Sequence, residues 1–158
     1  MTKELKQEYT LRITQANKTQ LITILYEMAL QYVDEASEAL AAGDRTAFKN
    51  AVRRIQGCMC ELMDSLHLEY EVAQNLLQLY LYINREVAKA ALYNNEENLE
   101  HVRPVLENLA AAYKKIEGED MTGPVMGNTQ TVYAGLTYGR DNLTENAADP
   151  AANRGFSV

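Results

Sequence analysis

Apolar side chains recur every three or four residues along four long stretches of the chain, with polar residues between them. This period is typical of amphipathic α-helices. The expected helices cover residues 18–42, 45–66, 69–93 and a stretch from after Asn94 to near Gly118. Because the connections between them are short, neighbouring helices should run antiparallel. The pattern therefore predicts an all-α fold: an antiparallel up-down four-helix bundle with a short N-terminal capping segment and an irregular C-terminal tail.

Residues that favour helix ends support these bounds. Asn17 and Asp44 are expected to cap the first two helices, and Gly43 is expected to end the first helix in the left-handed conformation. The run at 94–97 resembles a capping box for the fourth helix. Pro104 lies inside that helix, where it should bend the helix or split off a short first segment.

The first and third predicted helices carry more apolar surface than a bundle core needs. One apolar face of roughly 100° is enough for each helix, and the second and fourth helices supply one each. The other two carry two apolar rows each: Leu21, Leu25, Met28 and Tyr32 beside Ile22, Ala29, Val33, Ala36 and Leu40, and Leu76, Tyr80, Ile83 and Val87 beside Leu77, Leu81, Ala88 and Leu92. The N-terminal segment, the tail, a second copy or a partner should cover the surplus, unless a wide core absorbs it.

Glycine and proline divide the chain into two parts. Six of the 8 glycines and two of the 3 prolines lie at or after residue 118. We therefore expect a helical domain over residues 1–117, with an N-terminal cap segment at about 1–16, and a flexible tail over residues 118–158. Two parts of this tail, Val132–Tyr138 and Phe156, are apolar enough to dock on the domain.

Charge narrows the classes of partner. The 158 residues carry a formal net charge of −7, and the pI is about 4.9. Nucleic-acid binding and adhesion to anionic lipid both need clustered Lys and Arg, so neither is expected. No apolar run approaches the roughly 20 residues of a membrane span, and the polar first residues do not resemble a secretion signal. The sequence predicts a cytoplasmic protein with no membrane insertion.

The two cysteines are not placed for shared chemistry. Cys58 and Cys60 are two positions apart, so on a helix their thiols point about 200° apart and cannot bind one metal ion. We expect Cys58 to fill a small space in the core and Cys60 to be partly exposed.

Carboxylates near histidines are also poorly placed. Di-iron bundles use Glu-x-x-His motifs that point inward, whereas Asp64, three residues before His67, should face away from the core. Glu97 and His101 have the wrong spacing, and we expect no buried carboxylate at a matching height inside the first and third helices. We predict no catalytic residue, no metal site and no cofactor. An enzyme or metalloprotein built on the bundle is the alternative.

Tyrosine is the over-represented aromatic residue, with 10 Tyr against 2 Phe and no Trp. Tyr buries a large area at low entropic cost and keeps a hydroxyl for water, which suits a surface that is buried only part of the time. It equally suits the polar edges of a bundle core. Both interpretations stay open at this point.

Four runs of sequence, in order and at the right spacing, resemble those of one family. They are LITILYEMAL at 21–30, IQGCMCELMDSL at 55–66, AQNLLQLYLYI at 73–83 and LAAAY at 109–113. Together with Tyr9, which precedes the first long helix, they resemble FliS, the family of bacterial flagellin export chaperones, over roughly residues 5–117. Asn17-Lys18 stands where the family has Ser-Pro, and the family's Gly-Gly before the third helix is missing, which concerns loops more than the fold.

The resemblance implies a protein-binding function rather than catalysis. Chaperones of this kind bind the C-terminal segment of flagellin, which wraps the bundle as amphipathic helices, and so prevent premature filament polymerisation before the complex reaches the flagellar export gate. The implied client contacts lie on the spare rows, at Ile24, Leu25, Met28, Tyr32, Leu77, Leu81 and Leu92. Leu5, Tyr9 and Ile13 would lie in the empty client groove, with Tyr9 as a contact for the export gate. A helical adaptor that dimerises through its spare apolar rows is the alternative.

Overall fold

The computed structural model describes residues 1–126, and over that range it contains helices and no strand. The helices are α1 (Lys3–Gln15), α2 (Lys18–Ala42), α3 (Arg45–Asp64), α4 (Glu71–Tyr93) and α5 (Glu96–Ile116), followed by the 3₁₀ turn η1 (Glu117–Glu119). The predicted all-α class is confirmed for these residues. The apolar stretches predicted at Val132–Tyr138 and Phe156 lie outside them.

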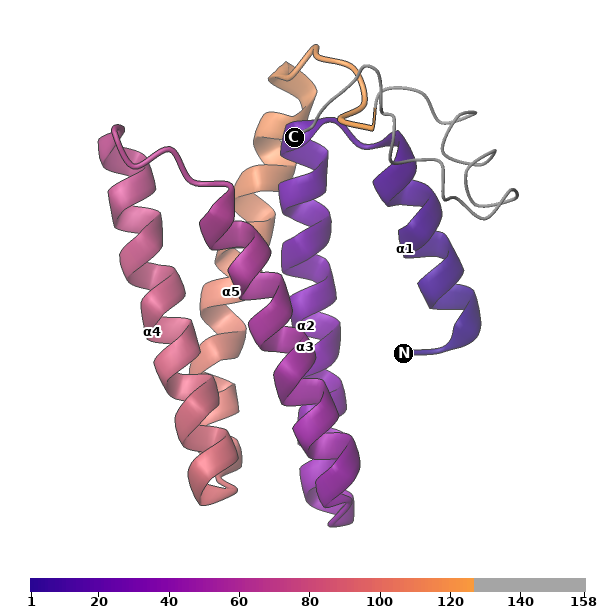
Figure 1. The fold of residues 1–158 in the computed structure, drawn as a ribbon, viewed down its shortest axis with the longest axis vertical. Coiled ribbons are helices and arrows are strands. Elements are labelled where there is room, and N and C mark those ends of the chain that lie inside the picture. Colours follow the sequence, from indigo (N-terminus) through magenta and orange to yellow (C-terminus); the bar gives the residue numbers. More distant parts are fainter. Residues whose placement is uncertain (127–158) are drawn as a thin grey trace, which may run out of the picture.

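The four long helices pack side by side in a ring. In this ring α2 contacts α3 and α5, and α4 contacts α3 and α5, so α2 and α4 occupy opposite corners. Figure 1 shows that consecutive helices of the ring run in alternating directions. Helix α1 lies outside the ring and packs on α2 (Figure 1). Among the helices of residues 1–126, none packs on the outside of α4 as α1 packs on α2.

Three predicted helix ends are confirmed by the hydrogen bonds that form there. Asn17 accepts from the Gln20 backbone N–H at 2.9 Å, and the Gln20 side chain accepts from the Asn17 N–H at 3.0 Å, which completes a capping box. Gly43 ends α2 at φ +74°, a conformation that favours glycine. Asp44 accepts from the Ala47 N–H at 3.0 Å and so caps α3.

Other predicted ends are wrong in detail. Asn94 does not start α5: it ends α4 at φ +54°, and Asn95 caps α5 by accepting from the Glu97 N–H. Asparagine adopts the left-handed region more readily than most residues, so adjacent asparagines can end one helix and start the next. Helix α5 continues through Pro104, so of the two predicted outcomes the split does not occur, and the bend stays a prediction. The connection between α3 and α4 is also longer than predicted, because α3 ends at Asp64 and α4 begins at Glu71.

The core of the ring is built from one face of each long helix. Its completely buried large side chains are Tyr26, Val33, Ile55, Met59, Leu62, Tyr80, Ile83, Val87, Leu99, Val102 and Leu106. A second, smaller cluster lies between α1 and α2 and centres on Tyr9, Ala16 and Ile24. The surplus row of α2 is therefore divided: Leu21 and Met28 pack with the N-terminal segment, whereas Leu25 and Tyr32 pack with the main core, so two of the possibilities that the sequence left open each hold in part.

A pair of tyrosines lies in the middle of the main core. The hydroxyl oxygens of Tyr26 and Tyr80 are 2.5 Å apart, and the Tyr26 ring packs edge-on against Tyr113, with ring centroids 5.4 Å apart. Burial raises the pKa of Tyr26, and burial likewise raises the pKa of Tyr80 to about 12. Because each hydroxyl is the other's hydrogen-bond partner, the apolar core contains these polar groups at a low cost.

Candidate functional site

The predicted client contacts on α2 are covered in this structure. Ile24 is 2% exposed beneath α1, and Met28 is half-buried and packs against both the main core and the smaller cluster. Leu25 is half-buried on the main core, and Tyr32 is buried, with the Arg54 guanidinium 5.8 Å from its ring centroid. None of these side chains is openly exposed: α1 covers Ile24 and Met28, and the main core covers Leu25 and Tyr32.

The covering element is α1, and its apolar side chains are those predicted for the cap. Leu5, Tyr9 and Ile13 lie at i, i+4 and i+8, and so share the face of α1 that packs against α2. The ion pair between Arg12 and Glu27, at 2.8 Å, adds a polar contact across the two helices, and the Arg12 guanidinium also lies 5.4 Å from the Tyr9 ring centroid. Both partners of this pair are about a third exposed, so its contribution is small.

The predicted contacts on α4 form a separate surface that remains open. Leu77 is half-buried, Leu81 is 38% exposed and Leu92 is 71% exposed. With Ala88, these residues line up along one flank of the helix at intervals of four or seven residues, and we call them the α4 row. The opposite flank of α4 faces α5, because Glu86 on that side contacts Asn98 of α5. The structure thus places the seven predicted residues on two surfaces at opposite corners of the ring, one covered and one open.

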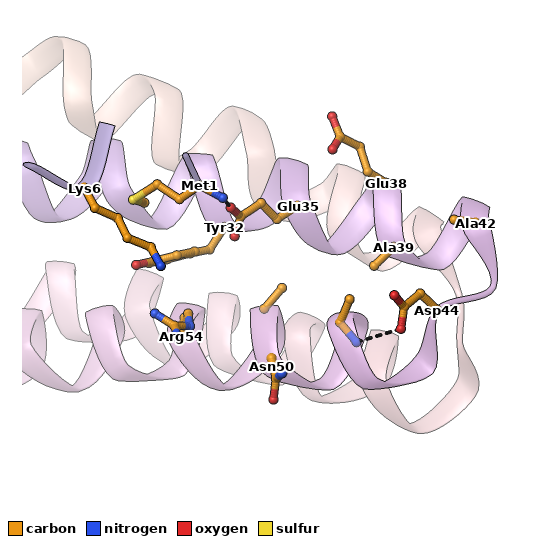
Figure 2. A pocket seen from close by; sticks show the side chains of 12 residues that line it. Met1, Lys6, Tyr32, Glu35, Glu38, Ala39, Ala42, Asp44, Asn50 and Arg54 are labelled. Atoms are coloured by element: carbon orange, nitrogen blue, oxygen red, sulfur yellow. Dashed lines mark hydrogen bonds and ion pairs between the residues drawn. The ribbon is translucent and has the colours of Figure 1, made fainter. Parts of the chain in front are cut away.

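A cavity of about 460 Å³ continues along α2 from the end of α1 (Figure 2). Figure 2 shows Met1 and Lys6 at one end of it, above Tyr32. Ala39 and Ala42 of α2 line the cavity from one side, and Ala47, Asn50, Ala51 and Arg54 of α3 line it from the other. The surface on which α1 lies therefore extends beyond α1 as an unfilled groove between α2 and α3.

The segment after α5 returns to the connection between α1 and α2. The Thr19 hydroxyl donates to Asp120 Oδ2 at 2.6 Å, and the Val125 N–H donates to the Ala16 carbonyl at 2.8 Å. Hydrogen bonds from Thr122 and Thr19 lower the pKa of Asp120. These hydrogen bonds join the segment that follows η1 to Ala16 and to the first turn of α2.

A buried carboxylate lies where none was expected. Glu86 of α4 is 5% exposed, accepts from Asn98 Nδ2 at 3.0 Å and lies 2.8 Å from His101 Nδ1 and 3.3 Å from Lys89 Nζ. The hydrogen bonds from Asn98, His101 and Lys89 lower the pKa of Glu86 to about 2. The expectation of no buried carboxylate inside the third predicted helix is wrong. Glu86 lies at the edge of the apolar stripe that Ile83 and Val87 form on α4. That position in the sequence was the sign that its carboxylate could be buried.

The hydrogen bonds of Glu86 connect two helices of the ring. The Glu86 network joins α4 to α5, and across residues 1–126 no three or more His, Cys, Asp or Glu side chains are grouped so that they could hold a metal ion. Cys58 is buried, which raises the pKa of its thiol to about 11, and Cys60 is exposed, as predicted for both. No helix within the described residues has the length and apolar character needed to cross a membrane.

Comparison with known proteins identifies relatives. Residues 1–120 match the family model described as "Flagellar protein FliS". The chain is similar to the "Flagellar secretion chaperone FliS" of Escherichia coli (strain K12), with 27% identity over 107 residues that cover 65% of this chain and 78% of that protein. It is also similar to the protein of the same name from Salmonella typhimurium (strain LT2), with 32% identity over 107 residues, or 66% of this chain and 79% of that protein.

Proposed function

Because the chain belongs to the FliS family, whose members are flagellar secretion chaperones and not enzymes, we propose that it binds the disordered C-terminal segment of flagellin in the cytoplasm. Binding would prevent premature filament polymerisation and assist delivery to the flagellar type III export apparatus. The observation that carries the proposal is the open α4 row, together with the cover that α1 provides over Ile24 and Met28 at the opposite corner of the bundle. In this proposal residues 1–117 form the client-binding unit, an antiparallel up-down bundle.

The α4 row has the spacing that an amphipathic helix needs on its partner. Leu77, Leu81, Ala88 and Leu92 extend over 16 residues of one helix, and a client helix would lay its own apolar residues along them. A disordered segment that folds on this surface buries apolar area only when it becomes helical, so folding and binding are coupled. Leu77, Leu81 and Leu92 are therefore proposed client contacts.

The row on α2 is the second proposed client contact, and α1 acts there as a removable cover. Ile24, Leu25, Met28 and Tyr32 would meet the client once α1 moves away. The proposal is supported by the placement of α1, which lies outside the ring, packs on α2 and leaves an unfilled groove beyond Met1. Release of α1 would also expose Tyr9, the proposed contact with the export gate.

A pair of matched substitutions tests the client surface. Leu81 and Leu79 are two residues apart on α4 and equally exposed, at 38% and 39%, but Leu79 lies on the flank toward α5. We expect Leu81→Asp to weaken binding of a flagellin C-terminal peptide by at least ~1.4 kcal/mol, about tenfold, and Leu79→Asp to bind like the unchanged protein. Fluorescence anisotropy measures the affinities, and circular dichroism should show unchanged helix content.

Two results would contradict the proposed surface. Equal losses of affinity from Leu79→Asp and Leu81→Asp would show that the flank of α4 does not matter. Loss of helix content in Leu81→Asp would place Leu81 in the fold rather than on the binding surface. Sedimentation that depends on protein concentration without any peptide would favour the adaptor that dimerises through its apolar rows.

A further inference from the structure

The first part of α3 has an unusual charge for this chain. Residues 45–60 contain four basic residues, Arg45, Lys49, Arg53 and Arg54, and no acidic residue, although the whole chain has 22 acidic and 15 basic residues. Basic side chains in the first turn of a helix oppose its macrodipole, so Arg45 does not stabilise α3 locally. The fold alone does not account for this concentration of positive charge.

Two of these side chains lie beside the α4 row. Ala47, Ala51 and Arg54 line the cavity shared with α2 (Figure 2), which marks the flank of α3 that faces α2. At about 100° per residue, Arg45 and Lys49 fall on the other flank, toward α4. Because α3 and α4 run in opposite directions (Figure 1), the first turns of α3 lie at the level of the last turns of α4.

A third basic residue lies on the outer side of the row. Arg85 is exposed and is about 40° around α4 from Leu81, so the C-terminal half of the row lies between basic residues from two helices. Within residues 1–126, no carboxylate is within ion-pairing distance of Arg45, Lys49 or Arg85. The Arg85 guanidinium instead lies 6.0 Å from the Tyr82 ring centroid.

The opposite end of the row has the opposite charge. Asp64 ends α3, and Glu69 and Glu71 lie at the start of α4, all exposed. Beside Leu92 and Ala88 the flanking side chains on α3 and α4 are thus basic, with exposed Asp44, Glu96 and Glu97 at the adjoining helix starts, whereas the charged side chains of α3 and α4 near the connection between these two helices are acidic. Such a polarised border can select both the charge and the direction of a bound helix.

We propose that the segment bound on the α4 row is an amphipathic helix whose apolar stripe is flanked by carboxylates at the end beside Arg45, Lys49 and Arg85. This inference rests on the proposed function and adds a specificity requirement to it: these basic side chains recognise the acidic end of the client helix. A client with the reverse charge order would place its carboxylates beside Asp64 and Glu71, where like charges repel.

Charge reversal at matched lysines tests the inference in the full-length protein. Lys49 and Lys115 are both exposed, and neither has a carboxylate within ion-pairing distance across the described residues, but only Lys49 lies beside the row. The probe is a peptide covering the C-terminal segment of the same organism's flagellin. We expect Lys49→Glu to raise its Kd about fivefold at low salt and Lys115→Glu to change it less than about twofold. Near 0.5 M salt the effect of Lys49→Glu should largely disappear.

The outcomes separate this inference from the function on which it rests. If the unchanged protein does not bind the peptide, the proposed function fails. If it binds and Lys49→Glu behaves like Lys115→Glu at both salt concentrations, the function stands and the charge requirement is wrong. Tighter binding by Lys49→Glu would show that the client helix carries basic rather than acidic residues at this end of its apolar stripe, and would also overturn the inference. Lys49→Gln should lose roughly half as much binding free energy as Lys49→Glu, which checks that charge rather than folding is responsible.

Discussion

Replacing Tyr9 with alanine tests whether α1 is a removable cover. Tyr9 is 8% exposed and is a central side chain of the cluster between α1 and α2. It belongs to that cluster and not to the main core, whose buried residues lie on the four long helices. The substitution should therefore weaken the docking of α1 and leave the ring of four helices folded.

The expected magnitude follows from how Tyr9 is buried. Truncation of a large aromatic side chain in a full core costs ~3–5 kcal/mol. At Tyr9 the contacts come mainly from α2, and Leu5 and Ile13 still hold α1 in place, so we expect about 2 kcal/mol. That free energy corresponds to a shift of about thirtyfold in the equilibrium between docked and released α1. If α1 and the client compete for the α2 row, client affinity can rise by at most this factor.

Two assays together decide whether the competition exists. Amide hydrogen exchange should become faster for residues 5–15 in Tyr9→Ala and stay unchanged in the protected core of α2–α5. Titration with the flagellin peptide should show a lower Kd than in the unchanged protein. Faster exchange with no change in Kd would refute the competition. A higher Kd would show that the Tyr9 side chain contacts the client directly.

Three further predictions concern the bundle itself. Tyr26→Phe should lower the free energy of unfolding in urea by about 1–2 kcal/mol, because it leaves the Tyr80 hydroxyl unpaired. The double variant Tyr26→Phe with Tyr80→Phe should lose clearly less than Tyr26→Phe alone, because it leaves no hydroxyl unpaired. A larger loss in the double variant would contradict this reasoning. Glu86→Gln should destabilise the protein by about 2 kcal/mol at neutral pH. Since folding lowers the pKa of Glu86 from about 4.5 to about 2, its stabilisation is complete above about pH 4.5 and is lost as the pH falls toward 2; a variant with the same acid sensitivity as the unchanged protein over that range would refute the assignment. Gly57→Ala should raise the free energy of unfolding by up to ~1 kcal/mol, because an added Cβ meets no atom within 4 Å and alanine favours the helix interior; a loss of stability would show a contact that the structure does not contain.

The sequence predicted the helices well because apolar periodicity and capping residues, which indicate a helix and its ends, depend only on neighbouring residues. The bounds of α2 follow from Asn17 and Gly43, whose capping preferences depend on adjacent residues. The surplus apolar rows also indicated that something must cover α2, and the i, i+4, i+8 spacing of Leu5, Tyr9 and Ile13 pointed to the segment that does. The exposed α4 row was likewise visible in the sequence as the second row of the third predicted helix.

The features that were missed depend on contacts between distant residues. Glu86 lies at the edge of the apolar stripe of α4, a position that α4 alone would leave exposed to water. It is buried because α5 places Asn98 and His101 beside it. Asp120 lies in a segment with turn-forming composition, and only the three-dimensional path of the chain brings it to Thr19. The adjacent asparagines at 94 and 95 were ambiguous because either can cap a helix, and the geometry of the connection decides between them.

Calorimetric titration of the full-length chain with a peptide from the flagellin C-terminus tests the central claim most directly. The proposed function predicts tight one-to-one binding with a large negative change in heat capacity, because apolar surface on the α4 row and on α2 becomes buried as the peptide folds. The absence of both a binding heat and a shift in sedimentation on adding peptide would contradict it. The open apolar row would then have to serve self-association or another segment of the chain.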